Sequence, residues 1–148
     1  MKIDIIVYTS GYMARDGYCF APPIAGLRLA ALTPVRYPVK VFHPPFDSLR
    51  LDTDADLIVL LVNDNFVDMA YRWADWYSAH GKYVVAGGAP VTTRLHCALE
   101  HCDAVMVGEI EPVWAAMVKD AAQGKLRDQY TTVEVSTLWN YLNVAAIG

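Results

Sequence analysis

Residues 57–62 read LIVLLV and are apolar at every position. Side chains along a β-strand point alternately to its two faces, so this run predicts a strand that is buried on both sides. Strands covered on both faces are typical of parallel sheets, which carry helices above and below. This stretch alone therefore predicts an α/β fold.

The flanking sequence contains further short apolar runs that alternate with helical patterns. Strands are predicted at residues 3–8, 39–43, 57–62, 83–86 and 104–107. The predicted helices begin at Pro22-Pro23, after the capping stretch Asn63-Asp64-Asn65, at Thr92 or Thr93, and at Glu111-Pro112. This order predicts a flavodoxin-like (Rossmann-type) α/β fold, with a doubly wound five-stranded parallel sheet and helices on both faces.

Single residues refine the predicted helices. Ile24, Leu27 and Ala31 fall on one face of the first helix, and Gly124 stands where a left-handed residue would close the last one. Three tryptophans at helical spacings are predicted to belong to the core: Trp73, Trp76 and Trp114.

The composition limits the class of protein. The chain has 148 residues, 55% of them hydrophobic, and a net charge of −4. That length suits one domain, and no run of about 18 apolar residues predicts a membrane span. The mild acidity argues against nucleic-acid binding, which needs clustered Lys and Arg. Three cysteines cannot form a complete disulfide framework, so a reducing cytoplasm is the expected compartment.

The last segment differs in pattern from the rest. Residues 128–148 first alternate in pattern, at Thr131, Val133 and Val135, and then end on an apolar, strand-like stretch without a capping signal. We therefore expect an α/β domain at residues 1–127, followed by a tail or linker at 128–148 in a chain that is a piece of a longer protein.

Ligands of open parallel sheets bind at the carboxyl ends of the strands. The loops that this rule selects contain Thr9, Ser10, Asn63, Asp64, Asn65, Gly87, Gly88, Ala89, Pro90, Gly108 and Glu109. Gly87 and Gly88 would let a ligand lie directly on the backbone, or would simply form a tight turn. The loop at residues 9–21 is long, and its three aromatic residues suit either covering a flat ligand or packing on the core.

Several kinds of chemistry lack their motifs in this sequence. It contains no G-x-G-x-x-G, no G-x-x-x-x-G-K-[ST] and no G-x-S-x-G. His96, Cys97, His101 and Cys102 are spaced badly for one helix face, and we interpret them as a buried cysteine with surface histidines. We predict no catalytic residue and no metal ligand.

Three segments in order carry a family resemblance: APPIAGLRLAAL at 21–32, VVAGGAP at 84–90 and DAVMVGEIEPVWAAMVKDA at 103–121. Over residues 1–127 the chain resembles the cobalamin-binding domain at the N-terminus of cobalamin-dependent radical S-adenosylmethionine (SAM) enzymes. The family's G-E-G-E reads Gly108-Glu109-Ile110-Glu111 here, so one glycine is lost. The D-x-H-x-x-G string, whose His ligates cobalt in another type of cobalamin domain, is absent.

The resemblance implies a role for each loop. Gly87, Gly88 and Ala89 would flank the nucleotide tail of the cofactor, and Pro90, Gly108 and Glu109 would also be cofactor-binding residues. Thr9, Ser10, Pro22 and Pro23 would line the other side of the tail. Asn63, Asp64, Asn65 and Phe66 would lie beneath the corrin ring, with no protein His on cobalt.

The resemblance also implies a missing half of the chemistry. Radical SAM enzymes hold a 4Fe-4S cluster on C-x-x-x-C-x-x-C, which this chain lacks. The cluster and S-adenosylmethionine would belong to a radical SAM catalytic domain, in the same or a separate chain, of what we expect to be a methyltransferase. Alone, this chain should bind cobalamin and not catalyse.

Two alternatives stay open from the sequence. One is a flavodoxin-like redox protein that binds flavin mononucleotide (FMN), since Thr9-Ser10-Gly11 is a passable start for a phosphate loop. The other is a ligand-free interaction domain that merely kept the fold.

Overall fold

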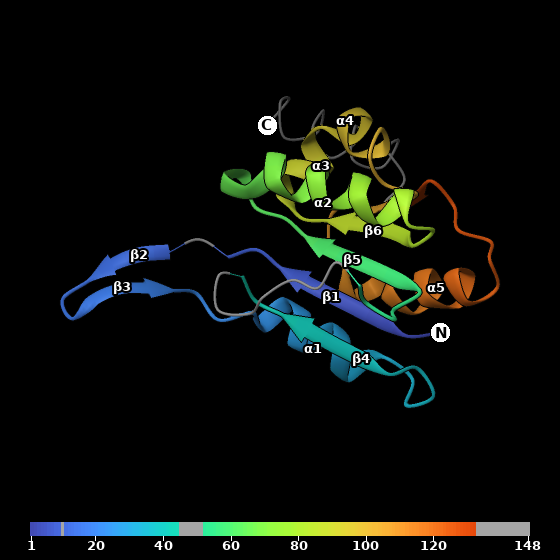
Figure 1. The fold of residues 1–148 in the computed structure, drawn as a ribbon, viewed down its shortest axis with the longest axis horizontal. Helices are drawn as coiled ribbons and strands as arrows, with labels where there is room; N and C mark the ends of the chain where they lie inside the picture. The colour runs from blue at the N-terminus through green and yellow to red at the C-terminus, as the bar shows by residue number, and fades with distance from the viewer. Residues whose placement is uncertain (10, 45–51, 133–148) are drawn as a thin grey trace, which may run out of the picture.

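A computed structural model describes residues 1–9, 11–44 and 52–132 of the chain. Its centre is a six-stranded, all-parallel sheet (Figure 1). The spatial order is β4 (Val39–Phe42), β1 (Ile3–Val7), β5 (Leu57–Leu61), β6 (Tyr83–Gly87), β7 (Ala104–Met106) and β8 (Gln129–Tyr130). The predicted flavodoxin-like fold class is confirmed, with the strand order reversing at β1.

The sheet has one strand more than predicted. β8 pairs with β7 through Gln129 and Tyr130, which lie in the segment predicted to be a tail. The Tyr130 hydroxyl donates a hydrogen bond to Asp120 in helix α5 (Glu111–Ala122), at 2.8 Å, and accepts one from the Arg127 amide. Two residues are too few to show a strand period, which is why the sequence did not reveal this strand. Residues 133–148 lie outside the described part of the chain.

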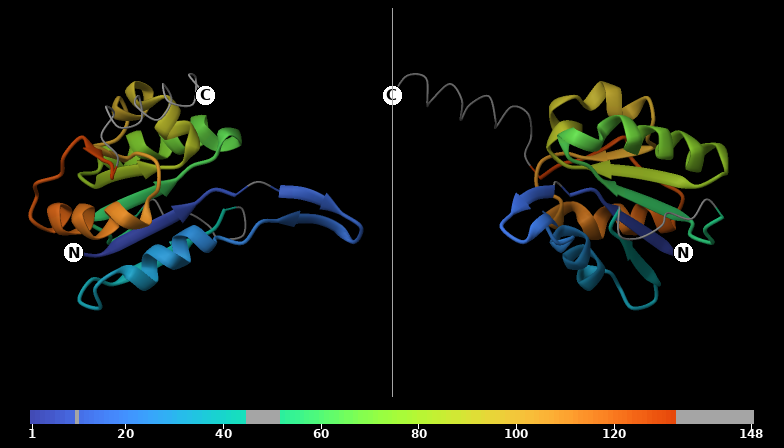
Figure 2. Two further views of the ribbon diagram at one scale, coloured as in Figure 1. Left: turned by 180° about the vertical axis from the view of Figure 1, so that it is seen from behind. Right: turned by 60° about the vertical axis from the view of Figure 1, so that its left-hand side comes forward.

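Helices cover both faces of the sheet (Figure 2). Helices α1 (Ile24–Leu32) and α5 pack on one face. The other face carries the 3-10 turn η1 (Asp64–Phe66) and helices α2 (Val67–Ala79), α3 (Ala89–Thr93) and α4 (Leu95–Leu99). Every residue of β5 is buried, as its uniform apolar run predicted, and every residue of β1 is buried as well. Among the described residues, no helix is both long and apolar enough to cross a membrane.

The long loop predicted at residues 9–21 contains a β-hairpin instead. β2 (Gly11–Ala14) pairs antiparallel with β3 (Gly17–Phe20), and Gly17 at the turn has a φ of +128°. Figure 1 shows the hairpin extending away from the end of β1 and from the body of the sheet. The hairpin therefore projects from the α/β domain.

Helix α1 packs through a face other than the one that its sequence suggested. Its buried residues are Gly26 and Leu29, whereas Ile24 and Leu27 are half exposed. A side chain at Gly26 would overlap that of Val7, so the glycine lets the helix lie close to β1.

Two further expectations about helices need correction. The helix predicted to be capped by Thr92 or Thr93 already begins at Ala89, and it is interrupted at Arg94. Trp114 is buried as predicted, but Trp76 is 41% exposed and lines a shallow hollow on α2 with Met69, Arg72 and Trp73. Gly124 has the left-handed φ predicted for it, +66°.

Asp4 is a carboxylate inside the sheet that should make stability depend on pH. It is 5% exposed and accepts a hydrogen bond from the Thr53 hydroxyl. Burial raises its pKa above the usual 3.8, so the folded state holds the proton more tightly than the unfolded chain does. The stability contributed by the protonated carboxyl is complete below pH 3.8 and is lost as the pH rises through the raised pKa.

We therefore expect Asp4→Asn to gain stability relative to the wild type between acidic and neutral pH. Urea unfolding of both proteins at an acidic pH and at neutral pH measures this change. The control is Asp16→Asn in the exposed hairpin turn, whose difference in stability from the wild type serves as the baseline. A difference between Asp4→Asn and the wild type that stays constant with pH would contradict the assignment.

Candidate functional site

The carboxyl ends of β1, β5, β6 and β7 are neighbours in the sheet, so the loops that follow them share one edge. Thr9, Asn63, Gly88 and Gly108 lie at the starts of these loops. Pro23 stands just before α1, which begins beyond the hairpin on the same edge. The structure thus brings together the predicted loops, while Ser10 lies outside the described residues.

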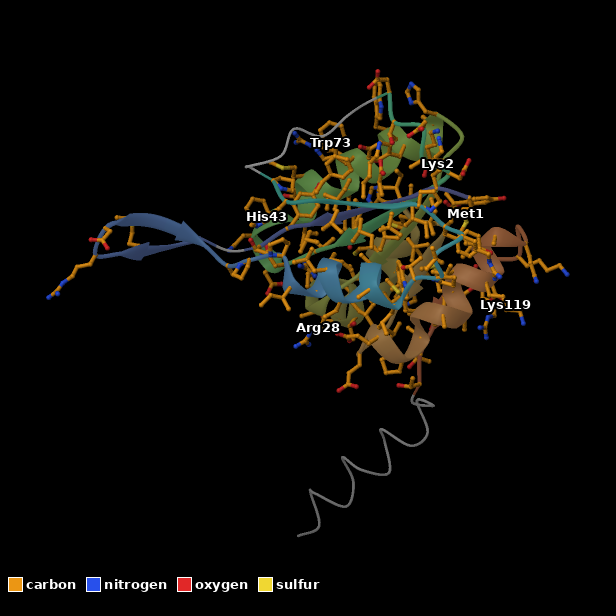
Figure 3. The ribbon with its side chains drawn as sticks, turned by 90° about the horizontal axis from the view of Figure 1, so that it is seen from below. Met1, Lys2, Arg28, His43, Trp73 and Lys119 are labelled. Carbon is orange, nitrogen blue, oxygen red and sulfur yellow. The ribbon has the colours of Figure 1, made fainter. Side chains whose placement is uncertain are left out.

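Thr9 is paired with a histidine that the sequence interpretation did not assign to the site. The Thr9 hydroxyl and His43 Nε2 share a hydrogen bond of 2.6 Å, and His43 is buried directly after β4. In Figure 3 His43 lies near the base of the hairpin, at the opposite end of the sheet from Met1 and Lys2. His43 could have been assigned to the candidate site from the sequence, because it follows a predicted strand at the same edge of the sheet.

Asn63 joins the end of β1 to the turn that precedes α2. Its side-chain amide donates to the Tyr8 carbonyl at 3.1 Å, and its Oδ1 accepts from the Asn65 amide at 3.2 Å. It therefore caps η1, as the Asn63-Asp64-Asn65 pattern predicted. Asp64 and Asn65 are exposed beside it, and Phe66 contacts the Tyr8 ring with centroids 5.7 Å apart.

Tyr8 is a second residue that the sequence interpretation missed. The side chain is 4% exposed, and its hydroxyl has no hydrogen-bond partner among the residues that the structure describes. Burial strongly raises the pKa of this hydroxyl, which stays protonated at physiological pH. Tyr8 belongs to the face of the sheet covered by α2.

Gly88 is required by the fold itself. Its φ of +122° and ψ of 169° lie in a region that only glycine adopts readily. A Cβ added there would overlap the Val62 carbonyl oxygen and would stand 3.3 Å from the Val62 nitrogen. Its own carbonyl accepts the Thr92 amide at 3.0 Å. The glycine thus permits a close approach of two loops.

Gly87 serves a different contact. It ends β6 on the face covered by α1 and α5, next to Ile110 and Met106. An added Cβ would stand 3.0 Å from Ile110 Cδ1 and 3.3 Å from Met106 Cε. The space that a side chain at Gly87 would use is therefore filled by Ile110 and Met106.

The loop between β7 and α5 leaves open backbone at the same edge. Gly108 has a φ of +77°, and a Cβ added there would meet nothing within 4 Å. Its amide donates to the Thr92 hydroxyl at 3.0 Å, which links this loop to α3. Glu109 is exposed, and the neighbouring Pro90 and Ala89 belong to the first turn of α3.

A hollow of about 580 Å³ lies between α1 and the start of α5. It is lined by Arg28, Ala31, Leu32, Glu109 and Glu111. Arg28 and Glu111 approach to 3.8 Å across it, but both side chains are well exposed, so this ion pair contributes little to stability. The hollow adjoins the loop that holds Gly108.

The histidines and cysteines near α4 do not converge on one point. His96 and Cys97 are exposed, while burial raises the pKa of the Cys102 thiol to about 12. His101 Nδ1 lies 2.7 Å from the Asp75 carboxylate, and its ring stacks on Tyr71. Within the described ranges, no group of three or more His, Cys, Asp or Glu could hold a metal ion.

Comparison with known proteins relates the chain to methyltransferases. It is 28% identical over 123 residues to bacteriochlorophyllide d C-8(2)-methyltransferase of Chlorobaculum tepidum, covering 79% of this chain and 27% of that protein. It is 41% identical over 61 residues to bacteriochlorophyllide d C-12(1)-methyltransferase of the same organism, covering 41% of this chain and 13% of the relative. No family model matches the chain, and no solved structure does.

The chain is thus a distant homologue of methyltransferases and spans about a quarter or less of their length.

Proposed function

We propose that this chain is the cobalamin-binding module of a B12-dependent radical SAM enzyme, a methyltransferase. The observation that carries the proposal is the similarity to two methyltransferases over a segment that makes up only about a quarter of the first relative. A segment of that size with a flavodoxin-like sheet suits a domain that holds a cofactor at its carboxyl edge. The three ordered segments that resemble cobalamin-binding domains give the cofactor class.

The carboxyl edge suits a corrinoid in one respect and not in another. There is open space beside Gly108 at this edge, whereas the Thr9 hydroxyl and the Asn63 side chain already bond to His43 and to the Tyr8 carbonyl. By contrast, Ile110 and Met106 occupy the space beside Gly87, where the resemblance places the nucleotide tail. The edge therefore leaves room for a ring beside Gly108, and a tail at Gly87 would require Ile110 and Met106 to move.

Each loop receives a role in this proposal. Asn63, Asp64, Asn65 and Phe66 would lie beneath the ring, and Thr9, Pro22 and Pro23 would line one side of the site. Ala89, Pro90, Gly108 and Glu109 would line the other. Bound cobalamin would supply a methyl group carried on cobalt, and the part of this chain is to hold and orient the ring.

The remaining chemistry would come from a partner domain. Cys19, Cys97 and Cys102 are too far apart in sequence for the three-cysteine cluster motif. A radical SAM domain, in the same or a separate chain, would therefore hold the 4Fe-4S cluster and S-adenosylmethionine. The cytoplasm is the proposed compartment, because such a cluster needs reducing surroundings.

A pair of matched glycine variants tests where a corrinoid binds. Gly108 and Gly124 both have left-handed φ values, +77° and +66°, but Gly108 is at the carboxyl edge and Gly124 follows the far end of α5. Asparagine tolerates this conformation, so each Gly→Asn variant should keep the fold. We expect Gly108→Asn to weaken hydroxocobalamin binding at least about tenfold, a change of about 1.4 kcal/mol.

Spectrophotometric titration measures the affinities, with FMN titrated in parallel. Gly124→Asn should bind hydroxocobalamin like the wild type. Equal affinities for both variants would remove the corrinoid from this edge, and binding of FMN instead would favour the flavin alternative.

A further inference from the structure

Thr92 joins helix α3 to the loop that follows β7, at the carboxyl edge of the sheet. Its hydroxyl oxygen accepts a hydrogen bond from the Gly108 amide at 3.0 Å. Thr92 is half-buried, and a Cβ added at its partner Gly108 would meet nothing within 4 Å. The sequence pattern suggested Thr92 only as a helix cap, whereas the structure places its hydroxyl beside the open space of the candidate site.

The bond with Gly108 uses only part of the bonding capacity of the Thr92 hydroxyl. A threonine hydroxyl offers one O–H donor and two acceptor lone pairs. Because the Gly108 amide is the donor, this bond occupies a lone pair and leaves the O–H proton unused. Within residues 1–9, 11–44 and 52–132, the Thr92 side chain makes no other hydrogen bond. Accepting a bond also polarises the hydroxyl, which makes it a better donor to a further group.

The next residue in the chain shows the ordinary use of a threonine in a helix. The Thr93 hydroxyl lies 3.1 Å from the Ala89 carbonyl, one turn earlier in α3, and 3.4 Å from the Pro90 carbonyl, and it donates to them. Its proton is therefore satisfied by its own helix. The Thr92 hydroxyl bonds instead to a neighbouring loop, so its proton can be donated to a ligand.

Neighbouring charges favour a neutral acceptor over an anionic one. Glu109 follows Gly108 and is exposed, and Glu111 comes two residues later at the start of α5. Both carboxylates would repel a phosphate close to Thr92. The carboxamide side chains on the rim of a corrin ring are neutral, whereas the nucleotide tail of cobalamin carries a phosphate. The ring is therefore the part of the cofactor that suits this donor.

We propose that Thr92 is a ligand-binding residue, whose hydroxyl donates a hydrogen bond to a carboxamide oxygen of the corrin ring. This inference rests on the proposed function, because it assumes that a corrin ring lies at the carboxyl edge. The open space beside Gly108 lets a carboxamide approach the hydroxyl while the Gly108 amide holds the oxygen in place.

Spectrophotometric titration of the full chain with hydroxocobalamin and with diaquocobinamide tests this role. Cobinamide has the same corrin ring but lacks the nucleotide. Thr92→Val should weaken the binding of both corrinoids about three- to tenfold, the loss expected for one neutral hydrogen bond. Thr92→Ser keeps the hydroxyl and should bind both like the wild type. Thr92→Asp can still accept from the Gly108 amide, but an ionised carboxylate has no proton to donate, so it should bind at least as weakly as Thr92→Val.

The matched control is Thr93→Val, which removes an exposed hydroxyl that bonds to its own helix. It should leave both affinities unchanged, and an equal loss in this variant would contradict a specific role of Thr92. If Thr92→Val folds poorly, the comparison of Thr92→Asp with Thr92→Ser decides.

The outcomes separate this inference from the proposed function. Wild-type affinity in Thr92→Asp would overturn the donor role, because it would show that Thr92 only holds the Gly108 loop. A loss in Thr92→Val that is confined to hydroxocobalamin would overturn the assignment to the ring. Both results would leave a corrinoid module in place. A wild type that binds neither corrinoid would overturn the proposed function, and the inference with it.

Discussion

Gly88→Ala is expected to destabilise the protein by at least about 3 kcal/mol, because two penalties fall on one residue. Its φ of +122° with a ψ of 169° strains any residue with a side chain. The added Cβ would also overlap the Val62 carbonyl oxygen, which belongs to a neighbouring loop and cannot rotate away. Urea unfolding, or the soluble yield if the variant does not fold, measures the effect.

Gly81→Ala is the matched control for Gly88→Ala. Gly81 has a φ of +75°, but a Cβ added there would meet nothing within 4 Å. Gly81→Ala should lower the free energy of unfolding by about 1 to 2 kcal/mol, which is the cost of the left-handed conformation alone. Equal losses for the two variants would show that the contact with Val62 is not important. Loss of ligand binding in Gly88→Ala is therefore no evidence for a ligand at Gly88.

Trp114→Ala should cost about 3 to 5 kcal/mol, since the side chain is 1% exposed and its removal leaves a large cavity. The indole Nε1 also donates to the Thr33 hydroxyl at 3.0 Å, and this hydroxyl donates to the Leu29 carbonyl at 2.7 Å. These bonds tie α5 to the end of α1, the two helices that flank the hollow beside the candidate site.

The chain offers a control of the same residue type for Trp114→Ala. Trp76 is 41% exposed on α2 and stacks on His80, so Trp76→Ala should cost no more than about 1 kcal/mol. Urea unfolding of both variants measures the difference. Similar losses would mean that Trp114 does not hold the two helices together.

The sequence predicted the main elements of the fold because their patterns are local. A strand buried on both faces, such as β5, shows itself as an unbroken apolar run, and prolines mark the starts of α1 and α5. The hairpin had a signal too, since Asp16-Gly17 is a common turn dipeptide, but the surrounding glycines and aromatic residues suggested a loop. The face on which α1 packs was not predictable from apolar periodicity, because a glycine makes its closest contact.

The loops that make up the candidate site could be selected from the sequence, but the contacts among their residues could not. The carboxyl-edge rule selects the loops after β1, β5, β6 and β7 from their order alone. By contrast, the reasons for Gly87 and Gly88 are contacts with Ile110 and Val62, which are more than 20 residues away in the chain. The pairing of Thr9 with His43 is equally long-range. Such contacts follow from the folded arrangement and leave no pattern in a single sequence.

The most direct test of the proposed function is the absorption spectrum of the purified chain after incubation with hydroxocobalamin and desalting. A corrin spectrum that co-elutes with the protein in a stoichiometric amount is the predicted result. The contradicting result is protein that elutes without corrin and, in a parallel sample, retains FMN or nothing.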